Sequence, residues 1–406
     1  MEVKEGYRLT NIGLIPTDWE TVRLGELLDY EQPTKYITKD IDAPDGIPVL
    51  TSNKSFILGY SSEDTGVFQK TPIILFDDFT TDRKYVDFAF KIRSSATKIL
   101  KMNSKDLNLK YIFNAFDTVK FQADDHKRYW ISEFQYLKIP YPSFVEQNKI
   151  VEILDTWEKA IDKKEHLLIE LLKRRKSLEI GLFNGQIRFQ NFNLNEEKIV
   201  TYLGEIPSDW ELKPISEIVQ KAKKPFSPEP ETLYREIGIR SHCKGIFHKE
   251  EVTGASLGNK SVFWIQPDCF VVNIVFAWEH AIAKTTEAEV GMIASHRFPM
   301  YKPKKGVLDL DYLLYYFKTA RGKHLLGLAS PGGAGRNKTL GQGEFAKLKI
   351  PVPSLAEQKR IVAVLSESDR EIELLKQQIA TLKEQKKGLM QKLLTGEIRV
   401  KTKNHE

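Results

Sequence analysis

This chain contains an internal sequence repeat. The motif Ile-Pro-Thr-Asp-Trp-Glu at 15–20 recurs as Ile-Pro-Ser-Asp-Trp-Glu at 206–211, and Pro-Tyr-Pro-Ser-Phe-Val-Glu-Gln at 140–147 recurs as Pro-Val-Pro-Ser-Leu-Ala-Glu-Gln at 351–358. The first pair of motifs is 191 residues apart and the second pair is 211 residues apart. A duplication of this size predicts two related units in a pseudo-twofold arrangement. Such a molecule would perform a similar task at two places.

The length and composition describe an ordinary globular protein. A chain of 406 residues can form two or three domains, each with its own core. No apolar run approaches the roughly 20 residues that cross a bilayer, and the N-terminus has no signal-peptide pattern. The two cysteines fit a reducing compartment. We therefore expect a soluble cytoplasmic protein without a membrane partner.

The charge is distributed unevenly between the two copies. Residues 21–138 hold 17 Lys and Arg against 17 Asp and Glu, whereas residues 212–349 hold 21 against 13. A basic surplus in one segment favours an anionic partner such as nucleic acid. A solvated basic surface would explain the same charge equally well.

A variable segment follows the first motif in each copy. Short runs typical of strands lie at 48–51, 56–60, 73–76 and 86–90 in the first copy, and at 262–265, 270–276 and 281–283 in the second. Each segment then has a helix that we expect to begin at an aspartate, Asp106 or Asp309. A last strand at 136–140 or 348–351 closes it. The pattern predicts two mixed α/β domains.

Each copy ends in a long amphipathic helix. Apolar residues recur in alternating steps of four and three, as in a coiled coil, and no proline interrupts 143–184 or 354–395. Gly185 and Gly396 are placed as helix stops. The predicted seams consist of Ile150, Leu154, Trp157, Ile161, Leu168, Leu171, Leu178 and Leu182, and of Ile361, Leu365, Ile372, Leu375, Ile379, Leu382, Leu389 and Leu393.

Two features of these helices leave alternatives open. Each apolar stripe could pack on its own globular domain, although the matching register favours pairing of the helices with each other. A basic residue, Arg175 or Lys386, interrupts both seams at the same place. It either extends past the seam to solvent or sets the register of the helix pair.

Catalytic motifs are missing from the sequence. It contains no phosphate-binding loop, dinucleotide fingerprint, zinc-protease motif or nucleophile elbow. The Asn-Pro-Pro-aromatic motif of amino-methyltransferases is also missing. Residues 273–276 are only weakly similar to that motif, and we predict a buried strand there. We therefore expect a chain that is not an enzyme and has no catalytic residues.

Three groups of residues could bind ions. The spacing of His242, Cys243, His248 and Cys269 matches no zinc pattern. Asp77, Asp78 and Asp82 could bind a divalent cation, but strand-end and turn aspartates are the commoner explanation. We expect no metal site. The glycine-rich loop at 331–338 could approach an anion closely.

The repeated motifs resemble those of one known family. The Asp-Trp and Glu-Gln motifs, with a Gly-x-Ile-Arg sequence after each helix at 185–188 and 396–399, are similar to the specificity subunit of type I restriction-modification systems. The resemblance implies an α+β fold, in which two long antiparallel coiled-coil helices join two mixed α/β target recognition domains. The expected boundaries are 1–142 for the first recognition domain, 143–186 for the first helix, 187–353 for the second domain, and 354–406 for the second helix and tail.

The resemblance also implies a function. Each recognition domain would read one half of an asymmetric, bipartite sequence in double-stranded DNA. The helices would space the domains and dock two methyltransferase subunits, and restriction-translocase subunits would complete the complex. This chain would bind no cofactor, because S-adenosylmethionine, ATP and Mg²⁺ would belong to the partners. The main alternative is a coiled-coil adaptor that binds proteins and has no DNA specificity.

Polar and basic residues on loops after strands are the candidates for contacts with DNA. Arg and Lys can read guanine or bind phosphate, and Asn suits adenine. In the first domain the candidates are Lys54, Thr80, Thr81, Arg83, Lys84 and Arg128. In the second they are Lys223, Lys224, Arg240, Lys244, Lys260, His280, Arg297, Arg336, Asn337 and Lys338.

Overall fold

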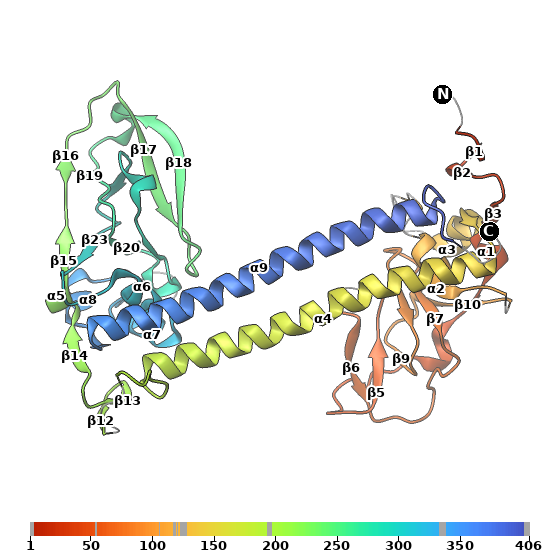
Figure 1. The fold of residues 1–406 in the computed structure, drawn as a ribbon, viewed down its shortest axis with the longest axis horizontal. Coiled ribbons are helices and arrows are strands. Elements are labelled where there is room, and N and C mark those ends of the chain that lie inside the picture. The colour runs from red at the N-terminus through yellow and green to blue at the C-terminus, as the bar shows by residue number, and fades with distance from the viewer. Residues whose placement is uncertain are drawn as a thin grey trace. The chain divides into compact units, whose positions relative to one another are not determined.

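The computed structural model describes residues 4–52, 55–104, 106–116, 119, 121, 128–192, 197–332 and 338–401 (Figure 1). The chain divides into two compact units. The first comprises Met1–His166 with Gln377–Glu406, and the second comprises Leu167–Lys376. Each unit contains one α/β domain and part of each long helix. Of the helices in the described ranges, none combines the length and the apolar character needed to cross a membrane.

The two long helices are α4 (Phe144–Phe183) and α9 (Leu355–Leu394), each of 40 residues. Both end where the sequence predicts a stop. Gly185 and Gly396 have φ angles of +68° and +73°, a backbone conformation that residues other than glycine rarely adopt. A Cβ at either position would also overlap a proline ring of the Asp-Trp motif, Pro207 or Pro16. The helix ends therefore require glycine for two reasons.

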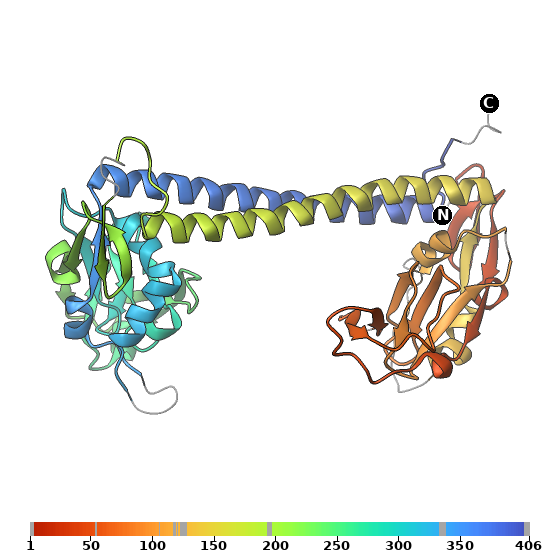
Figure 2. The same ribbon diagram turned by 90° about the horizontal axis from the view of Figure 1, so that it is seen from below.

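The helices pair antiparallel within each unit, side by side in Figures 1 and 2. In the first unit, Lys164 Nζ lies 2.9 Å from Gln378 Oε1, and Lys383 Nζ lies 2.6 Å from Glu165 Oε1. In the second unit, Arg174 Nη2 lies 2.6 Å from Glu371 Oε2. Late residues of α4 thus meet early residues of α9.

All sixteen apolar seam residues are buried or half-buried. Near the helix ends the stripe also enters the domain cores: Ile150, Leu154 and Leu393 belong to the core of the first unit, and Leu182 and Ile361 to that of the second. Both arrangements that the sequence left open therefore occur. The stripe packs on the domain at the helix ends and on the other helix between them.

In its described residues, the first domain consists of short strands, three short α-helices and two 3-10 helices. Its sheets have the orders β1-β2, β3-β11, β4-β10-β7-β8 and β6-β5-β9. The elements are β1 (Tyr7–Thr10), β2 (Gly13–Pro16), β3 (Glu20–Arg23), α1 (Leu24–Leu27), β4 (Leu28–Glu31), η1 (Pro33–Tyr36), β5 (Ile47–Leu50), β6 (Ile57–Ser61), β7 (Ile73–Asp77), β8 (Arg83–Val86), β9 (Lys91–Ile92), β10 (Thr97–Met102), α2 (Leu109–Ala115), α3 (Tyr129–Ser132), η3 (Phe134–Tyr136) and β11 (Lys138–Tyr141).

The second domain repeats this arrangement, with a five-stranded sheet in place of the three-stranded β6-β5-β9 sheet. Its sheets have the orders β12-β13, β14-β24, β15-β23-β20-β21 and β16-β19-β22-β17-β18. The elements are β12 (Lys198–Thr201), β13 (Gly204–Pro207), β14 (Glu211–Pro214), α5 (Ile215–Ile218), β15 (Val219–Ala222), β16 (Pro225–Phe226), β17 (Leu233–Ile239), β18 (Ile246–Thr253), η4 (Gly254–Leu257), β19 (Val262–Trp264), β20 (Phe270–Val272), η5 (Ala277–Glu279), β21 (Ile282–Lys284), η6 (Glu287–Glu289), β22 (Ile293–Ser295), β23 (Met300–Pro303), α6 (Leu310–Lys318), α7 (Ala320–Leu328), α8 (Gln342–Lys347) and β24 (Lys349–Val352).

Strand register shows which residues are equivalent in the two four-stranded sheets. Strands β4 and β15 both begin directly after a four-residue helix. Leu28 of β4 pairs with Met102 of β10, and Val219 of β15 pairs with Pro303 of β23, so these pairs occupy equivalent positions. Following the register one strand further makes Leu75 of β7 equivalent to Val271 of β20. Asp77 then corresponds to Asn273, and Asp78 to Ile274. The two copies therefore share a backbone frame even where their sequences differ.

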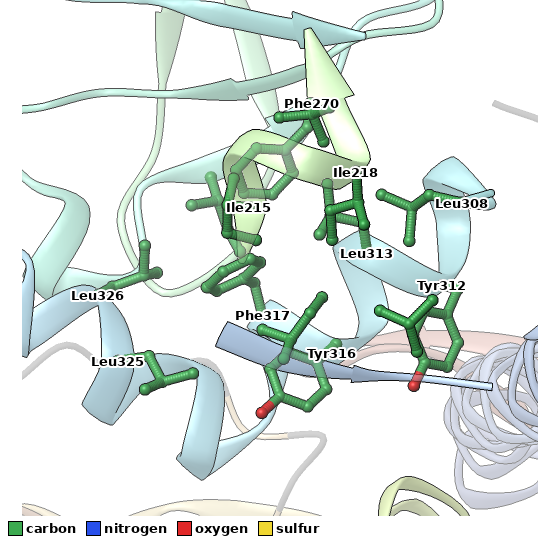
Figure 3. Close-up of a cluster of buried hydrophobic side chains, with 14 of the residues drawn as sticks. Ile215, Ile218, Phe270, Leu308, Tyr312, Leu313, Tyr316, Phe317, Leu325 and Leu326 are labelled. Carbon is green, nitrogen blue, oxygen red and sulfur yellow. The ribbon is translucent and has the colours of Figure 1, made fainter. Parts of the chain in front are cut away.

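The core of the second unit lies between its four-stranded sheet and helices α6 and α7 (Figure 3). Phe270 of β20 packs with Phe317 of α6, their ring centroids 5.5 Å apart. Ile215 and Ile218 of α5 complete this cluster, and all four side chains are buried. The apolar spacing along α6 places its buried side chains on one face, toward the sheet.

Several predicted elements differ in the structure. The N-cap of α2 is Asn108, whose side chain accepts a hydrogen bond from the Tyr111 N–H at 3.0 Å, so the assignment of Asp106 was wrong. Asp309 caps α6 as predicted. The strand predicted at 86–90 is wrong beyond Val86, and 273–276 form a turn after β20 instead of a buried strand. Asn273 ends this strand because its side chain bonds to the following backbone.

Candidate nucleic-acid interface

The repeated motifs meet in one polar cluster in each unit. In the second unit, Trp210 Nε1 donates a hydrogen bond to Glu357 Oε2 at 3.1 Å. Arg188, from the Gly-x-Ile-Arg sequence after α4, contacts Glu357 at 2.9 Å and Asp209 at 2.7 Å. This cluster joins the Asp-Trp motif of the second domain to the first turn of α9 and to the end of α4.

The first unit contains the equivalent cluster. Trp19 Nε1 donates to Glu146 Oε2 at 3.0 Å, and Arg399 contacts Glu146 and Asp18, each at 2.8 Å. Hydrogen bonds from Arg399 to Asp18, and then to Glu146, raise the pKa of this guanidinium although burial opposes them. The arginine that follows one helix thus holds the domain that precedes the other helix.

The basic residues in the seams also form ion pairs. Arg175 Nε lies 2.6 Å from Asp369 Oδ1, and Tyr315 of α6 donates to Asp369 Oδ2 at 2.8 Å. At the equivalent place in the first unit, Lys386 Nζ lies 3.6 Å from Glu158, which Lys110 of α2 also contacts at 3.5 Å. Both basic side chains are mostly buried and paired with the opposite helix, which favours a role in register.

Three loops meet at the end of strand β7 in the first domain. The Asp78 N–H donates to the Ala96 carbonyl at 3.1 Å, and the Tyr129 N–H donates to the Asp78 carbonyl at 3.0 Å. These bonds join the β7–β8 turn, the β9–β10 loop and the first residue of α3. We call residues 78–82, 93–96 and 128 the first loop cluster.

The same three loops meet in the second domain. The Ile274 N–H donates to the Arg297 carbonyl at 3.0 Å, and the Leu340 N–H donates to the Ile274 carbonyl at 2.8 Å. Ile274 is the register equivalent of Asp78, so this network is conserved between the copies. We call residues 273–281, 296–299 and 338–341 the second loop cluster.

A side-chain acceptor stiffens the central turn of each cluster. Asp77 Oδ1 accepts hydrogen bonds from the N–H groups of Phe79 and Thr80, both at 2.9 Å. The equivalent Asn273 Oδ1 accepts from the Val275 N–H at 3.1 Å. Such bonds fix a tight turn without a regular sheet partner. Because each turn is held from within, its outer side chains have a defined direction.

The aspartates that could have formed a cation site are used in other ways. Asp77 also accepts a hydrogen bond from the Ser52 hydroxyl at 2.9 Å. Asp78 forms a buried ion pair with Lys98 at 3.4 Å and accepts from the Trp130 N–H at 2.9 Å. Within the described part of the chain, no three His, Cys, Asp or Glu side chains are grouped so that they could hold a metal ion.

The first loop cluster contains three of the predicted DNA contacts. Thr80 and Arg128 are exposed there, and Thr81 has the left-handed φ of +61°. Arg83 and Lys84 lie half-buried on the edge strand β8, and the Arg83 guanidinium lies 5.3 Å above the Phe116 ring. Lys54 lies outside the described residues.

The second loop cluster borders a basic groove of about 380 Å³. Lys260 and Arg297 line it together with Asn273, Phe276 and His296. A cavity of about 100 Å³ shares His296 with this groove and is lined by Lys221 and Lys223. The exposed Lys224 follows Lys223 in the connection between β15 and β16.

The other predicted residues of the second domain have different positions. Lys338 lies 5.6 Å above the ring of Trp278 at the second loop cluster. Arg240 and Lys244 flank the exposed β17–β18 turn. Arg336 and Asn337 lie outside the described residues.

His280 is 9% exposed, which does not fit a direct contact with DNA. Burial, and then the charges of Lys323 and His242, lower its pKa to about 4. A neutral, buried imidazole indicates a structural role in the second loop cluster. The backbone carbonyl of His280 also accepts a hydrogen bond from the Cys243 N–H at 2.9 Å.

Sequence reasoning missed four exposed or groove-lining residues of the clusters, namely Phe79, Arg93, Phe276 and His296. The two phenylalanines follow closely after a strand-ending Asp or Asn, and this is the signal that could have identified them. The arginine and histidine carry no such signal, because only the fold brings their loops to the end of β7 or β20.

The comparisons with known proteins cover nearly the whole chain. The family described as "Type I restriction modification DNA specificity domain" matches residues 16–173 and 207–384. The Escherichia coli "Type I restriction enzyme EcoR124I/EcoR124II specificity subunit" is 31% identical over 391 residues, which cover 88% of this chain and 91% of the relative. The putative MjaX specificity subunit of Methanocaldococcus jannaschii is 25% identical and covers 98% of both chains.

Two solved structures share the fold. A type I restriction-modification S subunit from M. genitalium superposes with a TM-score of 0.57 at 13% identity, over 97% of this chain and 98% of the other. A chain from a structure of the assembly and conformational transition of a type I restriction-modification system superposes with a TM-score of 0.54 at 15% identity, over 95% and 99%.

Proposed function

This chain belongs to the family of type I restriction-modification specificity subunits, and from this premise we propose that its two loop clusters are the surfaces that read the two halves of a bipartite DNA sequence. The chain supplies the DNA sequence specificity of its complex. The observation that carries the proposal is the common hydrogen-bonded frame around Asp78 and Ile274, which presents different side chains in the two domains.

Chemistry supports this assignment of the surface. The second loop cluster borders a groove with Lys260 and Arg297, groups that bind phosphate or guanine. The first presents Thr80 and Arg128 on its exposed surface. Rigid turns with varied polar side chains suit base reading, because the backbone frame stays constant while the contacts change.

The remaining roles follow from the family. We propose that the chain is non-catalytic and acts in the cytoplasm with two methyltransferase subunits and with restriction-translocase subunits. S-adenosylmethionine, ATP and Mg²⁺ would then be bound by those partners. The antiparallel α4–α9 pair, with its ion pairs at Arg175 and Lys386, would hold the recognition domains at a defined spacing on DNA.

The direct test is to purify the chain with its neighbouring methyltransferase and to map methylated adenines across a genome. We expect one split, asymmetric sequence motif. Replacing residues 21–138 with the equivalent segment of another family member should change one half of that motif and leave the other half unchanged. Absence of any sequence preference, with a methyltransferase shown to be active, would support the protein-binding adaptor instead.

The basic surplus of the second domain leads to a prediction about salt dependence. The double variant Lys223→Gln/Lys260→Gln should reduce the slope of log affinity against log salt by about 2, because each lost phosphate contact contributes about 0.9. The matched double variant Arg93→Gln/Arg128→Gln in the first domain should reduce it less. Titrations of the assembled complex with DNA at several salt concentrations measure both slopes. Equal reductions would contradict a larger electrostatic contribution from the second domain.

A further inference from the structure

Each loop cluster exposes a phenylalanine beside basic side chains. Phe79 is 42% exposed and Phe276 is 40% exposed, although phenylalanine is usually buried. Register makes Phe276 equivalent to Thr80, so the two rings are one position apart on the same turn. An exposed aromatic ring on this turn therefore occurs in both copies, even though the surrounding sequences differ.

Hydrogen bonds within the turn fix the backbone that carries each ring. The Phe79 N–H is bonded to the buried Asp77 carboxylate at 2.9 Å, and Asp77 is fixed by Ser52. The Phe276 N–H donates to the Asn273 carbonyl at 3.1 Å. Trp278 folds back on the same turn, where its Nε1 donates to the Val275 carbonyl at 3.1 Å. A ring on such a support loses little conformational freedom when it is covered by a ligand.

The surroundings of the rings indicate an anionic ligand with flat apolar faces. Phe276 lines the groove that contains Lys260 and Arg297. Phe79 lies in the cluster that also presents Arg93 and Arg128. Cations beside an exposed ring suit a DNA backbone beside stacked bases, whereas a purely polar turn would suffice for phosphate contacts alone.

We propose that Phe79 and Phe276 are wedges, each of which inserts between two neighbouring base pairs of its own half-site and partly unstacks them. This inference rests on the proposed function, because it requires that the loop clusters face DNA. Apolar side chains that enter a base step kink the duplex, and the cost of unstacking depends on the step. Each phenylalanine would thus add specificity at a step where it forms no hydrogen bond.

The test uses the chain assembled with its methyltransferase and a duplex that contains the mapped sequence. 2-Aminopurine is placed at successive positions in each half-site, away from the methylated adenines, because a methyltransferase that flips its target base would unstack it independently. We expect a fluorescence increase of about threefold or more at one step in each half-site, consistent with local unstacking.

The variants separate the two wedges. Phe276→Ala should abolish the increase in the second domain's half-site only, and Phe79→Ala that in the first domain's half-site only. Phe276→Leu and Phe79→Leu should retain most of it, because leucine also acts as a wedge. Phe144→Ala, which replaces a ring of the same 42% exposure at the start of α4, should change neither signal. Thermal melting of each variant checks that it folds.

The outcomes distinguish the wedge from the proposed function. If the wild-type complex methylates a split motif but shows no increase at any step, or if the increase survives both alanine variants, the wedge inference is overturned. If the wild-type complex shows no sequence preference at all, the proposed function fails first. Loss of each signal in its own half-site, with rescue by leucine, supports the wedge.

Discussion

Replacing Arg188 with methionine is expected to destabilise the second unit by about 3–5 kcal/mol, the usual cost of removing one partner from a buried ion pair. The Glu357 side chain is only 3% exposed, and without Arg188 it would lose its buried cationic partner while the Trp210 indole N–H still donates to it. Burial by itself lowers the pKa of Arg188, but hydrogen bonds to Glu357 and Asp209 outweigh it and raise the pKa. The guanidinium is therefore charged at any pH at which the chain is folded.

Hydrogen exchange of the intact chain measures this effect unit by unit, since a two-unit protein has no single unfolding free energy. Exchange should accelerate in the second unit and remain unchanged in residues of the first domain. Arg399→Met should have a smaller effect on the first unit, because the Arg399 side chain is 32% exposed. Arg174→Met removes an exposed ion pair with Glu371 and should change stability by less than about 1 kcal/mol. Equal effects of Arg188→Met and Arg174→Met would refute the importance of the buried cluster.

Replacing Lys98 with methionine is expected to destabilise the first domain by about 3–5 kcal/mol, because the Asp78 carboxylate would remain buried without its cation. The second domain shows that the fold does not need this ion pair. Strand register places Ile274 and Pro299 at the equivalent positions. The double variant Asp78→Leu/Lys98→Met should therefore be more stable than Lys98→Met alone.

A double-mutant cycle on hydrogen exchange of the first domain measures the coupling between Asp78 and Lys98. We expect the double variant to recover part of the loss, but not all of it, since the Trp130 N–H also loses its acceptor. A double variant that is less stable than both single variants would show that the pair is not the source of the effect. The same proteins assayed for methylation would report whether the first loop cluster needs the pair to keep its shape.

The scaffold was more predictable than the loop clusters for a physical reason. A coiled-coil seam and its glycine stops depend on local spacing, so the residues from Ile150 to Leu182 could be assigned from periodicity alone. The loop clusters depend on contacts between distant segments. Leu340 reaches Ile274 across the sequence through one backbone hydrogen bond, and no local pattern specifies that bond.

The same distinction explains where the fold places the predicted site residues. Thr80 and Arg297 follow strands, as the sequence-based prediction requires, and the fold brings both into loop clusters. His280 also follows a strand run, but tertiary packing buries it. Phe79 and Phe276 have the sequence signature of ordinary apolar residues. Exposure is a property of the packed chain, so the sequence alone could not distinguish these rings from core residues.

The duplication, the two long helices, their seams and the membership in a family can all be predicted from the sequence, because these depend on repeats and periodicity along the chain. The role of the repeated motifs, by contrast, depends on contacts that form when the chain folds. Asp18, Trp19 and Glu146 lie far from Arg399 in sequence, and folding brings them together because a buried carboxylate must be paired. The two arginines that follow the helices therefore hold the domains in place, and the turns at Asp77 and Asn273 present the two different surfaces that we propose to read DNA.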